Sequence, residues 1–296
     1  MTPLILLRSL LFVPATTPER IPKALGSGAD AVIVDLEDAV PADRKAEARD
    51  VLARFLKESA EPPRPPLFVR VNAPGTPWLE EDVEAVVLPG LAGIVLPKAE
   101  DPGEVRALDA SSFSLAEKRK CEPPGLIPVV ESALGLVRAF DIASASSRSL
   151  ALALGGEDFA RDLGAVRTPG GEELSLARMQ VVVAARAAGV LPLDTVYTHF
   201  QDEAGLARDA EWARRVGFAG KLLIHPRQVE TVNRAFSPRP EDVGEARAVV
   251  SAFDAAQEKG EAVASLDGKM LDPAVVGQAR RVVELAEEIA RLEGAC

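Results

Sequence analysis

Acidic and basic side chains stand where several short apolar runs of this sequence end. In chain order these positions are Glu37 and Asp38, Arg70, Lys98, Glu131 and Asp158. Carboxylates that lie close together raise one another's pKa unless a cation or protons compensate. Oxygen ligands without a nearby His or Cys are typical of Mg²⁺ or Mn²⁺, and Mg²⁺ commonly uses one or two carboxylates with water and substrate oxygens. The pattern therefore predicts a hard divalent cation and disfavours zinc.

The same charges also admit a purely structural interpretation. The acids could form salt bridges with Arg70 and Lys98, and a buried pair between Arg70 and Glu37 is the simplest example. Against this, Arg70 offers a permanent charge and a planar set of donors that suits a substrate carboxylate or a developing enolate oxygen. We favour the substrate role for Arg70, with Glu37 and Asp38 orienting Arg70 and Lys98.

The two histidines, His199 and His225, are alternative general bases. His225 is followed by Pro226, a combination typical of the start of a helix, and His199 stands beside Phe200. Both histidines are therefore secondary candidates for the role of base.

Eight short apolar runs must position these side chains. They span residues 9–14, 31–37, 67–72, 93–98, 127–131, 149–155, 194–197 and 221–225. Continuous Val, Ile and Leu runs predict strands buried on both faces, as in parallel sheets. Helical patterns lie between them at residues 44–58, 77–87, 134–143, 174–188 and 204–216.

This alternation of strands and helices predicts an α/β fold, a closed (β/α)₈ TIM barrel over residues 1–236. Eight strands close a barrel whose interior is filled by side chains, and active groups stand at the carboxyl ends of those strands. No Gly-x-Gly-x-x-Gly follows an early strand, which weakens a dinucleotide-binding alternative.

The pattern changes after Pro238. Residues 241–258 and 273–293 predict two charged amphipathic helices with no strand pattern like those of the barrel. Between them, Asp267–Gly268 is a turn signal flanked by short apolar runs, which predicts a small hairpin. We expect residues 237–296 to form an appended C-terminal helical extension with a short hairpin.

The amino-acid composition argues against some classes of binding partner. Acidic residues outnumber basic ones, 45 to 34, and a formal charge of −11 would repel duplex nucleic acid. No stretch approaches the ~20 uninterrupted apolar residues of a membrane helix, and the first apolar run lacks the charged start of a signal peptide. The two cysteines cannot supply a disulfide framework. We predict a cytoplasmic protein with small-molecule partners and no nucleic-acid or membrane partner.

Seven segments also have a familiar form when taken together. They are RSLLFVP (8–14), VDLEDAV (34–40), VRVN (69–72), LPK (96–98), ESALG (131–135), GGEDF (155–159) and GKLLIHPRQ (220–228). In this order they resemble the citrate lyase β-subunit family, which includes malyl-CoA lyases and related CoA-ester lyases. A weaker similarity continues at GKMLD (268–272). One such segment is a weak signal, whereas seven at successive strand ends are a strong one.

The resemblance implies roles for particular residues. In the family, Mg²⁺ is held by the Glu of ESALG and the Asp of GGEDF, which are Glu131 and Asp158 here. The Arg of VRVN, here Arg70, contacts substrate, which Glu131 would also help to bind through the metal. In the CoA-lyase branch a catalytic Asp from the C-terminal segment acts across a subunit boundary, and its match is Asp272. The resemblance therefore also implies a homo-oligomer, with a trimer as the expected state.

These expectations describe a Mg²⁺-dependent carbon–carbon lyase. It would cleave or form a citryl-, malyl- or citramalyl-like hydroxyacyl thioester, giving an acetyl thioester and a 2-oxo acid such as oxaloacetate or glyoxylate. Mg²⁺ would polarise the keto carbonyl, and Asp272 would take a methyl proton from the acetyl thioester. Two alternatives stay open: a hydroxyacyl-CoA thioesterase that uses the same site, and a non-catalytic subunit of a multi-enzyme lyase. The presence together of Glu131, Asp158, Arg70 and Asp272 argues against the second.

Overall fold

The computed structural model describes residues 6–59, 61–168, 170–258, 264–266 and 269–294. Two compact units make up the chain. One is Leu7–Asn233, and the other contains the C-terminal residues from Arg234 onward.

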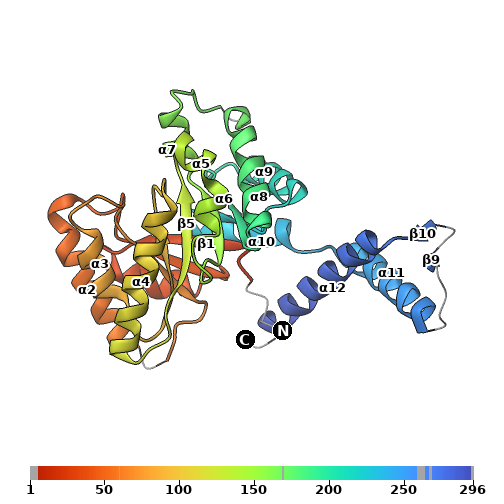
Figure 1. Ribbon diagram of the computed structural model, residues 1–296, viewed down its shortest axis with the longest axis horizontal. Helices are drawn as coiled ribbons and strands as arrows, with labels where there is room; N and C mark the ends of the chain where they lie inside the picture. The colour runs from red at the N-terminus through yellow and green to blue at the C-terminus, as the bar shows by residue number, and fades with distance from the viewer. Residues whose placement is uncertain (1–5, 60, 169, 259–263, 267–268, 295–296) are drawn as a thin grey trace. The chain divides into compact units, whose positions relative to one another are not determined.

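The first unit is a closed barrel of eight parallel strands (Figure 1). The strands are β1 (Ser9–Pro14), β2 (Ala31–Asp35), β3 (Leu67–Arg70), β4 (Leu91–Leu96), β5 (Gly125–Val130), β6 (Ala151–Leu154), β7 (Leu191–Asp194) and β8 (Gly220–Leu223). Each strand pairs in parallel with the next, and β1 also pairs with β8, which closes the ring. The predicted (β/α)₈ barrel is confirmed.

Helices lie outside the ring of strands (Figure 1). They are α1 (Ile21–Leu25), α2 (Lys45–Glu58), α3 (Leu79–Val86), α4 (Pro102–Arg119), α5 (Ala133–Val137), α6 (Ala139–Ala143), α7 (Gly156–Asp162), α8 (Ser175–Ala187), α9 (Glu203–Val216) and α10 (Val229–Phe236). Short 3₁₀ helices directly precede four of them: η1 (Pro18–Arg20), η2 (Ala42–Arg44), η3 (Glu172–Leu174) and η4 (Pro226–Gln228).

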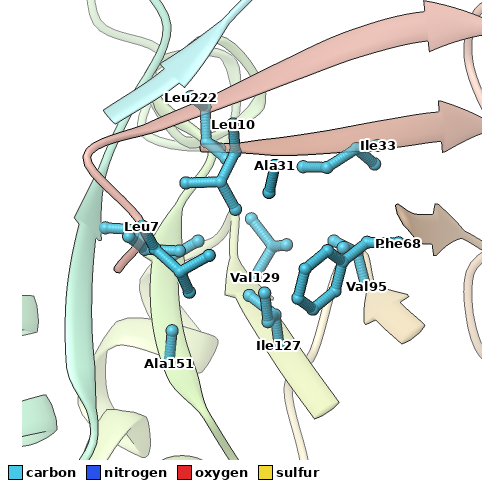
Figure 2. Close-up of a cluster of buried hydrophobic side chains, with 12 residues drawn as sticks. Leu7, Leu10, Ala31, Ile33, Phe68, Val95, Ile127, Val129, Ala151 and Leu222 are labelled. Carbon is cyan, nitrogen blue, oxygen red and sulfur yellow. The ribbon is translucent and has the colours of Figure 1, made fainter. Parts of the chain in front are cut away.

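Apolar side chains pack together inside the barrel (Figure 2). Every strand contributes to this buried cluster, which contains Leu7, Leu10, Ala31, Ile33, Phe68, Val95, Ile127, Val129, Ala151, Ala153, Leu193 and Leu222. A Cβ on Gly93 would lie 2.5 Å from the Phe68 ring, so Gly93 leaves the space that this ring fills. All five residues of β2 are buried, which is the physical reason for its continuous apolar sequence. The packed interior holds the strand ends rigidly.

The structure differs from the sequence prediction at several elements of the barrel, and the long helix α4 was not among the predicted helices. The seventh strand was expected at residues 194–197, but it is Leu191–Asp194. The true strand contains Pro192, a residue that argues against a central strand, although its carbonyl still accepts a hydrogen bond from Ala219 N. The helix expected at 134–143 is divided into α5 and α6 at Arg138, whose ψ of 10° leaves the helical range.

The second unit contains the two predicted C-terminal helices, α11 (Pro240–Glu258) and α12 (Pro273–Glu293), which pack side by side (Figure 1). Strands β9 (Ala264–Leu266) and β10 (Lys269–Leu271) pair in antiparallel fashion, as expected for the hairpin, while the predicted turn Asp267–Gly268 lies outside the described residues. In the described part of the chain, no helix is both long and apolar enough to cross a membrane.

Candidate active site

Arg70 and Asp35 end the adjacent strands β3 and β2 and stand opposite each other in the sheet register. Arg70 Nε donates to Asp35 Oδ1 at 2.7 Å, and Nη2 donates to Oδ2 at 2.6 Å. Arg70 Nη1 also lies 3.1 Å from Glu37 Oε2. The pair with Glu37, which the sequence analysis gave as the structural alternative, therefore exists, but Asp35 is the principal partner, and our sequence analysis did not single it out. Its position at the end of the second apolar run was the available signal.

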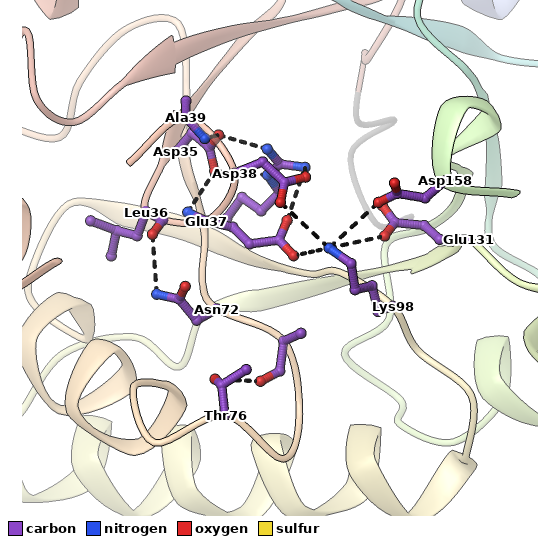
Figure 3. Close-up of polar contacts among 12 residues, drawn as sticks. Asp35, Leu36, Glu37, Asp38, Ala39, Asn72, Thr76, Lys98, Glu131 and Asp158 are labelled. Carbon is purple, nitrogen blue, oxygen red and sulfur yellow. Dashed lines mark hydrogen bonds and ion pairs between the residues drawn. The ribbon is translucent and has the colours of Figure 1, made fainter. Parts of the chain in front are cut away.

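Lys98 is the centre of a group of four carboxylates (Figure 3). Its ammonium donates to Glu37 Oε1 and lies 3.6 Å from Asp38 Oδ1. The same Nζ lies 3.8 Å from Glu131 Oε2 and 3.5 Å from Asp158 Oδ2. The structure thus brings together all the strand-end residues that the sequence analysis had selected.

The backbone of Lys98 is unusual as well. Its φ of 50° lies in the left-handed region, which side chains other than glycine adopt infrequently. Such conformations concentrate at functional sites, where the surrounding structure offsets their cost of about 1–3 kcal/mol. Here Lys98 is the second residue after strand β4, and the conformation accompanies an ammonium placed among several acids.

Glu131 follows strand β5 and is buried. The pKa of this carboxyl is raised to about 8, chiefly by burial and then by the nearby charge of Glu37, while Lys98 and Arg70 act in the opposite direction. Its Oε2 has no hydrogen-bond partner among the described residues. A buried carboxylate oxygen without a donor fits a cation ligand, because a bound cation would supply the missing positive partner.

Asp158 lies in the first turn of α7, just after strand β6. Arg161 Nη1 is 2.7 Å from its Oδ1, which leaves Oδ2 facing Lys98. Gly155 lets the two chain segments approach, because a Cβ there would lie 2.5 Å from Glu131 Cγ. The backbone thus brings Glu131 and Asp158 to one place.

The donor set fits Mg²⁺ in number and in kind. Within the described residues, no group of three or more His, Cys, Asp or Glu side chains is arranged to hold a metal by itself. Two carboxylates suffice for Mg²⁺, which usually retains water and binds substrate oxygens. Glu131 and Asp158 would hold such an ion and leave its remaining positions to small ligands.

A cavity of about 470 Å³ opens at these residues. Arg70, Glu131 and Asp158 are among its charged groups, and Phe12 and Leu222 are among its apolar ones. This combination of an apolar wall and a few convergent polar groups is typical of a small-molecule site.

Neither histidine is among the residues that line this cavity. His225 Nδ1 accepts a hydrogen bond from Arg227 N at 3.2 Å and caps η4, which confirms the predicted helix start. The His225 ring also stacks on Phe200 with 4.7 Å between ring centres. His199 makes an edge contact with Tyr197. These contacts are structural, and they give neither histidine a place beside the acids.

Asp272 belongs to the C-terminal unit. It precedes α12, and its Oδ1 accepts a hydrogen bond from Val275 N at 2.9 Å. The side chain therefore caps the helix, an arrangement that typically contributes ~1 kcal/mol. Its proposed catalytic role stays a prediction.

The fold and the cavity define a (β/α)₈-barrel enzyme whose site, at the carboxyl ends of its strands, is rich in carboxylates of the kind that bind a divalent cation. Residues 8–226 match the HpcH/HpaI aldolase/citrate lyase family, and the chain belongs to this family. Aldolases and citrate lyases break carbon–carbon bonds, and the chain is accordingly a carbon–carbon lyase.

Curated relatives span nearly the whole chain. The citrate lyase subunit beta of Leuconostoc mesenteroides subsp. cremoris is 39% identical over 94% of this chain and 93% of its own length. The mitochondrial citramalyl-CoA lyase of Homo sapiens is 34% identical over 95% of this chain and 86% of its own length. The (3S)-malyl-CoA thioesterase of Cereibacter sphaeroides is 37% identical over 96% of this chain and 95% of its own length. Both lyases and a thioesterase are thus similar to this chain.

Solved structures show the same fold with ligands. The CitE protein of Mycobacterium tuberculosis, in complex with magnesium, acetoacetate and coenzyme A, has a TM-score of 0.75 and 32% identity, covering 95% of this chain and 98% of its own. A citrate lyase beta subunit from the same organism, complexed with oxaloacetate and magnesium, has a TM-score of 0.64 and 35% identity over 78% of this chain and 96% of its own.

Proposed function

We propose that this protein is a Mg²⁺-dependent lyase that cleaves or forms a citryl-, malyl- or citramalyl-like thioester. Its products in the cleavage direction are an acetyl thioester and a 2-oxo acid such as oxaloacetate or glyoxylate. The observation that carries the proposal is the convergence of Glu131 and Asp158 beside Arg70 in one cavity. Similar proteins crystallised with magnesium and with oxaloacetate or acetoacetate support the choice of ligands.

Glu131 and Asp158 are the proposed ligands of Mg²⁺, and Glu37, Asp38 and Lys98 surround them. When bound, the ion supplies a Lewis acid for the carbonyl of the 2-oxo acid. Lys98 keeps the neighbouring acids from repelling one another, because its single positive charge lies within 4 Å of four carboxylates.

Arg70 is proposed to bind the substrate carboxylate. Asp35 fixes the plane of the guanidinium through Nε and Nη2, so the group is oriented before substrate arrives. Arg70 lines the cavity, and its guanidinium carries more N–H donors than the two bonds to Asp35 use, so donors are available for a substrate carboxylate.

Asp272 is proposed as the base, supplied by a neighbouring copy in a homo-oligomer, with a trimer as our expected state. The helix cap occupies its Oδ1, and Oδ2 would take the methyl proton of the acetyl thioester during condensation. The resulting enolate carbon then forms the new bond to the keto carbon of the 2-oxo acid, and the former keto oxygen takes a proton from water to become the hydroxyl. In the cleavage direction the hydroxyl gives its proton to water, the carbon–carbon bond breaks, and Asp272 returns its proton to the methyl carbon.

A hydroxyacyl-CoA thioesterase is the second candidate, because the similar protein of Cereibacter sphaeroides has that activity in its name. Water would then release the hydroxy acid and the free thiol. A non-catalytic role within a multi-enzyme lyase is the third, since several relatives are named as subunits.

Product analysis with purified protein, Mg²⁺ and a panel of citryl, malyl and citramalyl thioesters tests these proposals. A lyase releases a 2-oxo acid and an acetyl thioester, whereas a thioesterase releases a hydroxy acid and the thiol. Glu131→Gln serves as the control for contaminating activity. If wild-type protein turns over none of these thioesters, the subunit role is favoured and the lyase proposal fails. Fractionation of the source cells tests the predicted cytoplasmic location.

A further inference from the structure

Lys45, at the start of α2, is a buried lysine outside the group of acids. Its ammonium donates to two successive backbone carbonyls, Leu36 O and Glu37 O, each at 2.7 Å. It also lies 5.3 Å from the centre of the Trp78 ring. Among the described residues, no carboxylate lies within ion-pair distance of this ammonium. The ammonium of Lys45 thus binds the backbone of one short turn, residues 36–40.

This burial has an energetic cost. Burial lowers the pKa of Lys45, although the charges of Asp35 and Asp82 oppose the shift. Buried ammonium groups are usually paired with a carboxylate because desolvation is expensive. A residue that only filled space here would not need a charge, so the donors of Lys45 point to a positional role.

Asn72, which follows strand β3, also binds this turn (Figure 3). Asn72 Nδ2 donates to Leu36 O at 3.1 Å and to Asp82 Oδ2 at 2.6 Å. Asn72 N donates to the same Asp82 oxygen at 2.8 Å, and Asp82 is fully buried. Leu36 O therefore accepts hydrogen bonds from two side chains that come from different parts of the barrel.

The turn leads directly into the site. Glu37 N donates to Asp35 Oδ1 at 2.9 Å, and Val40 N closes the turn on Glu37 O at 3.0 Å. With its backbone held, the Glu37 carboxylate reaches Lys98 through Oε1 and Arg70 through Oε2. A small displacement of Glu37 would shift both cations at once.

We propose that Lys45 is a positioning residue for this site. By fixing the carbonyls of Leu36 and Glu37, it sets the Glu37 carboxylate, which in turn places the Lys98 ammonium beside Glu131 and Asp158. The consequence for ligand binding rests on the proposed function, whereas the effect on the turn does not.

The first arm of the test measures hydrogen exchange of the backbone amides in the turn. Lys45→Met keeps the apolar stem beside Trp78 and removes the donors, and Lys57→Met is the matched control on the exposed side of α2. We expect the Val40 amide to exchange about tenfold faster in Lys45→Met, with strand β5 amides unchanged, and no change in Lys57→Met. Wild-type exchange at Val40 in Lys45→Met overturns the proposal. If Lys45→Met does not fold, Lys45→Leu, which also removes the donors, replaces it under the same criterion.

The second arm measures calorimetric binding of oxaloacetate with Mg²⁺ in the wild type, Lys45→Met, Glu37→Gln and the double variant. We expect Lys45→Met to weaken binding about tenfold alone and by less than about twofold in the Glu37→Gln background, because Lys45 acts through Glu37. Equal losses in both backgrounds would assign Lys45 a general structural role and overturn the proposal. Should the wild type not bind oxaloacetate, the proposed function fails, and the exchange measurement still decides the role of Lys45.

Discussion

Arg70 Nη2 and Asp35 Oδ2 lie 2.6 Å apart at the ends of two adjacent barrel strands, and a second bond from Nε to Oδ1 makes the pair bidentate. Both side chains are largely buried, so the pair is only weakly screened by solvent. Asp35 also accepts hydrogen bonds from Glu37 N and Ala39 N. One carboxylate therefore orients the guanidinium and shapes the turn beside it.

Replacing Asp35 by Asn should destabilise the protein by about 3 kcal/mol, because it leaves a buried guanidinium without its main countercharge. Urea unfolding of the purified variant measures this. Glu47→Gln, which breaks the exposed Arg44–Glu47 pair, is the control and should change the free energy of unfolding very little, because solvent screens this pair. Equal stability losses in the two variants would contradict the role given to Asp35.

Glu131→Gln and Asp158→Asn should each weaken Mg²⁺ binding by about tenfold or more, because each removes one of two charged ligands. Calorimetric titration with MgCl₂ checks this. Glu211→Gln is the control, since Glu211 pairs with Arg214 on α9 and does not line the cavity. Wild-type affinity in either ligand variant would refute the metal assignment.

The raised pKa of Glu131 predicts how the stability of the metal-free protein depends on pH. With a folded-state pKa of about 8 against an ordinary value of 4.5, the folded state binds more protons between these two pH values than the unfolded state does. The free energy of unfolding should therefore fall as pH rises from about 5 to 8. Denaturant titrations in EDTA measure this slope, and Glu131→Gln should remove most of it. If the free energy of unfolding rises with pH equally in the wild type and in Glu131→Gln, Glu131 does not titrate in this range.

Asp272→Asn separates capping from catalysis. Asn caps a helix about as well as Asp but cannot accept a methyl proton, so folding and Mg²⁺ binding should stay normal while turnover falls by about 10² or more. The measurement is steady-state turnover on the thioester identified by product analysis, with circular dichroism as the check on folding. Unchanged turnover would leave Asp272 as a cap and place the base elsewhere.

The proposed homo-oligomer has its own direct check. Sedimentation velocity at micromolar concentration should show an assembly, and mixing Asp272→Asn with Glu131→Gln subunits should restore part of the turnover if Asp272 acts on a neighbouring copy. A fully active monomer would exclude this arrangement.

The positions of the site residues could be predicted from the sequence. Strands buried on both faces must be continuously apolar, so the charged residue that ends each run marks a carboxyl end of the barrel. Glu37, Arg70, Lys98, Glu131 and Asp158 were all located in this way, and the structure gathers them into one group. The capping geometry of Asp272 was likewise foreseeable from Pro273 at the first helical position.

Only the tertiary structure decided which of these side chains are partners. The bidentate bond between Asp35 and Arg70 depends on the register of β2 against β3, and the four acids around Lys98 come from different strand ends that only barrel closure brings together. Lys45 and Asn72 both donate hydrogen bonds to Leu36 O, although they lie nine and 36 positions after Leu36 in the chain. Sequence spacing determines which face or end of an element a residue occupies, whereas contacts between elements follow from how the whole barrel closes.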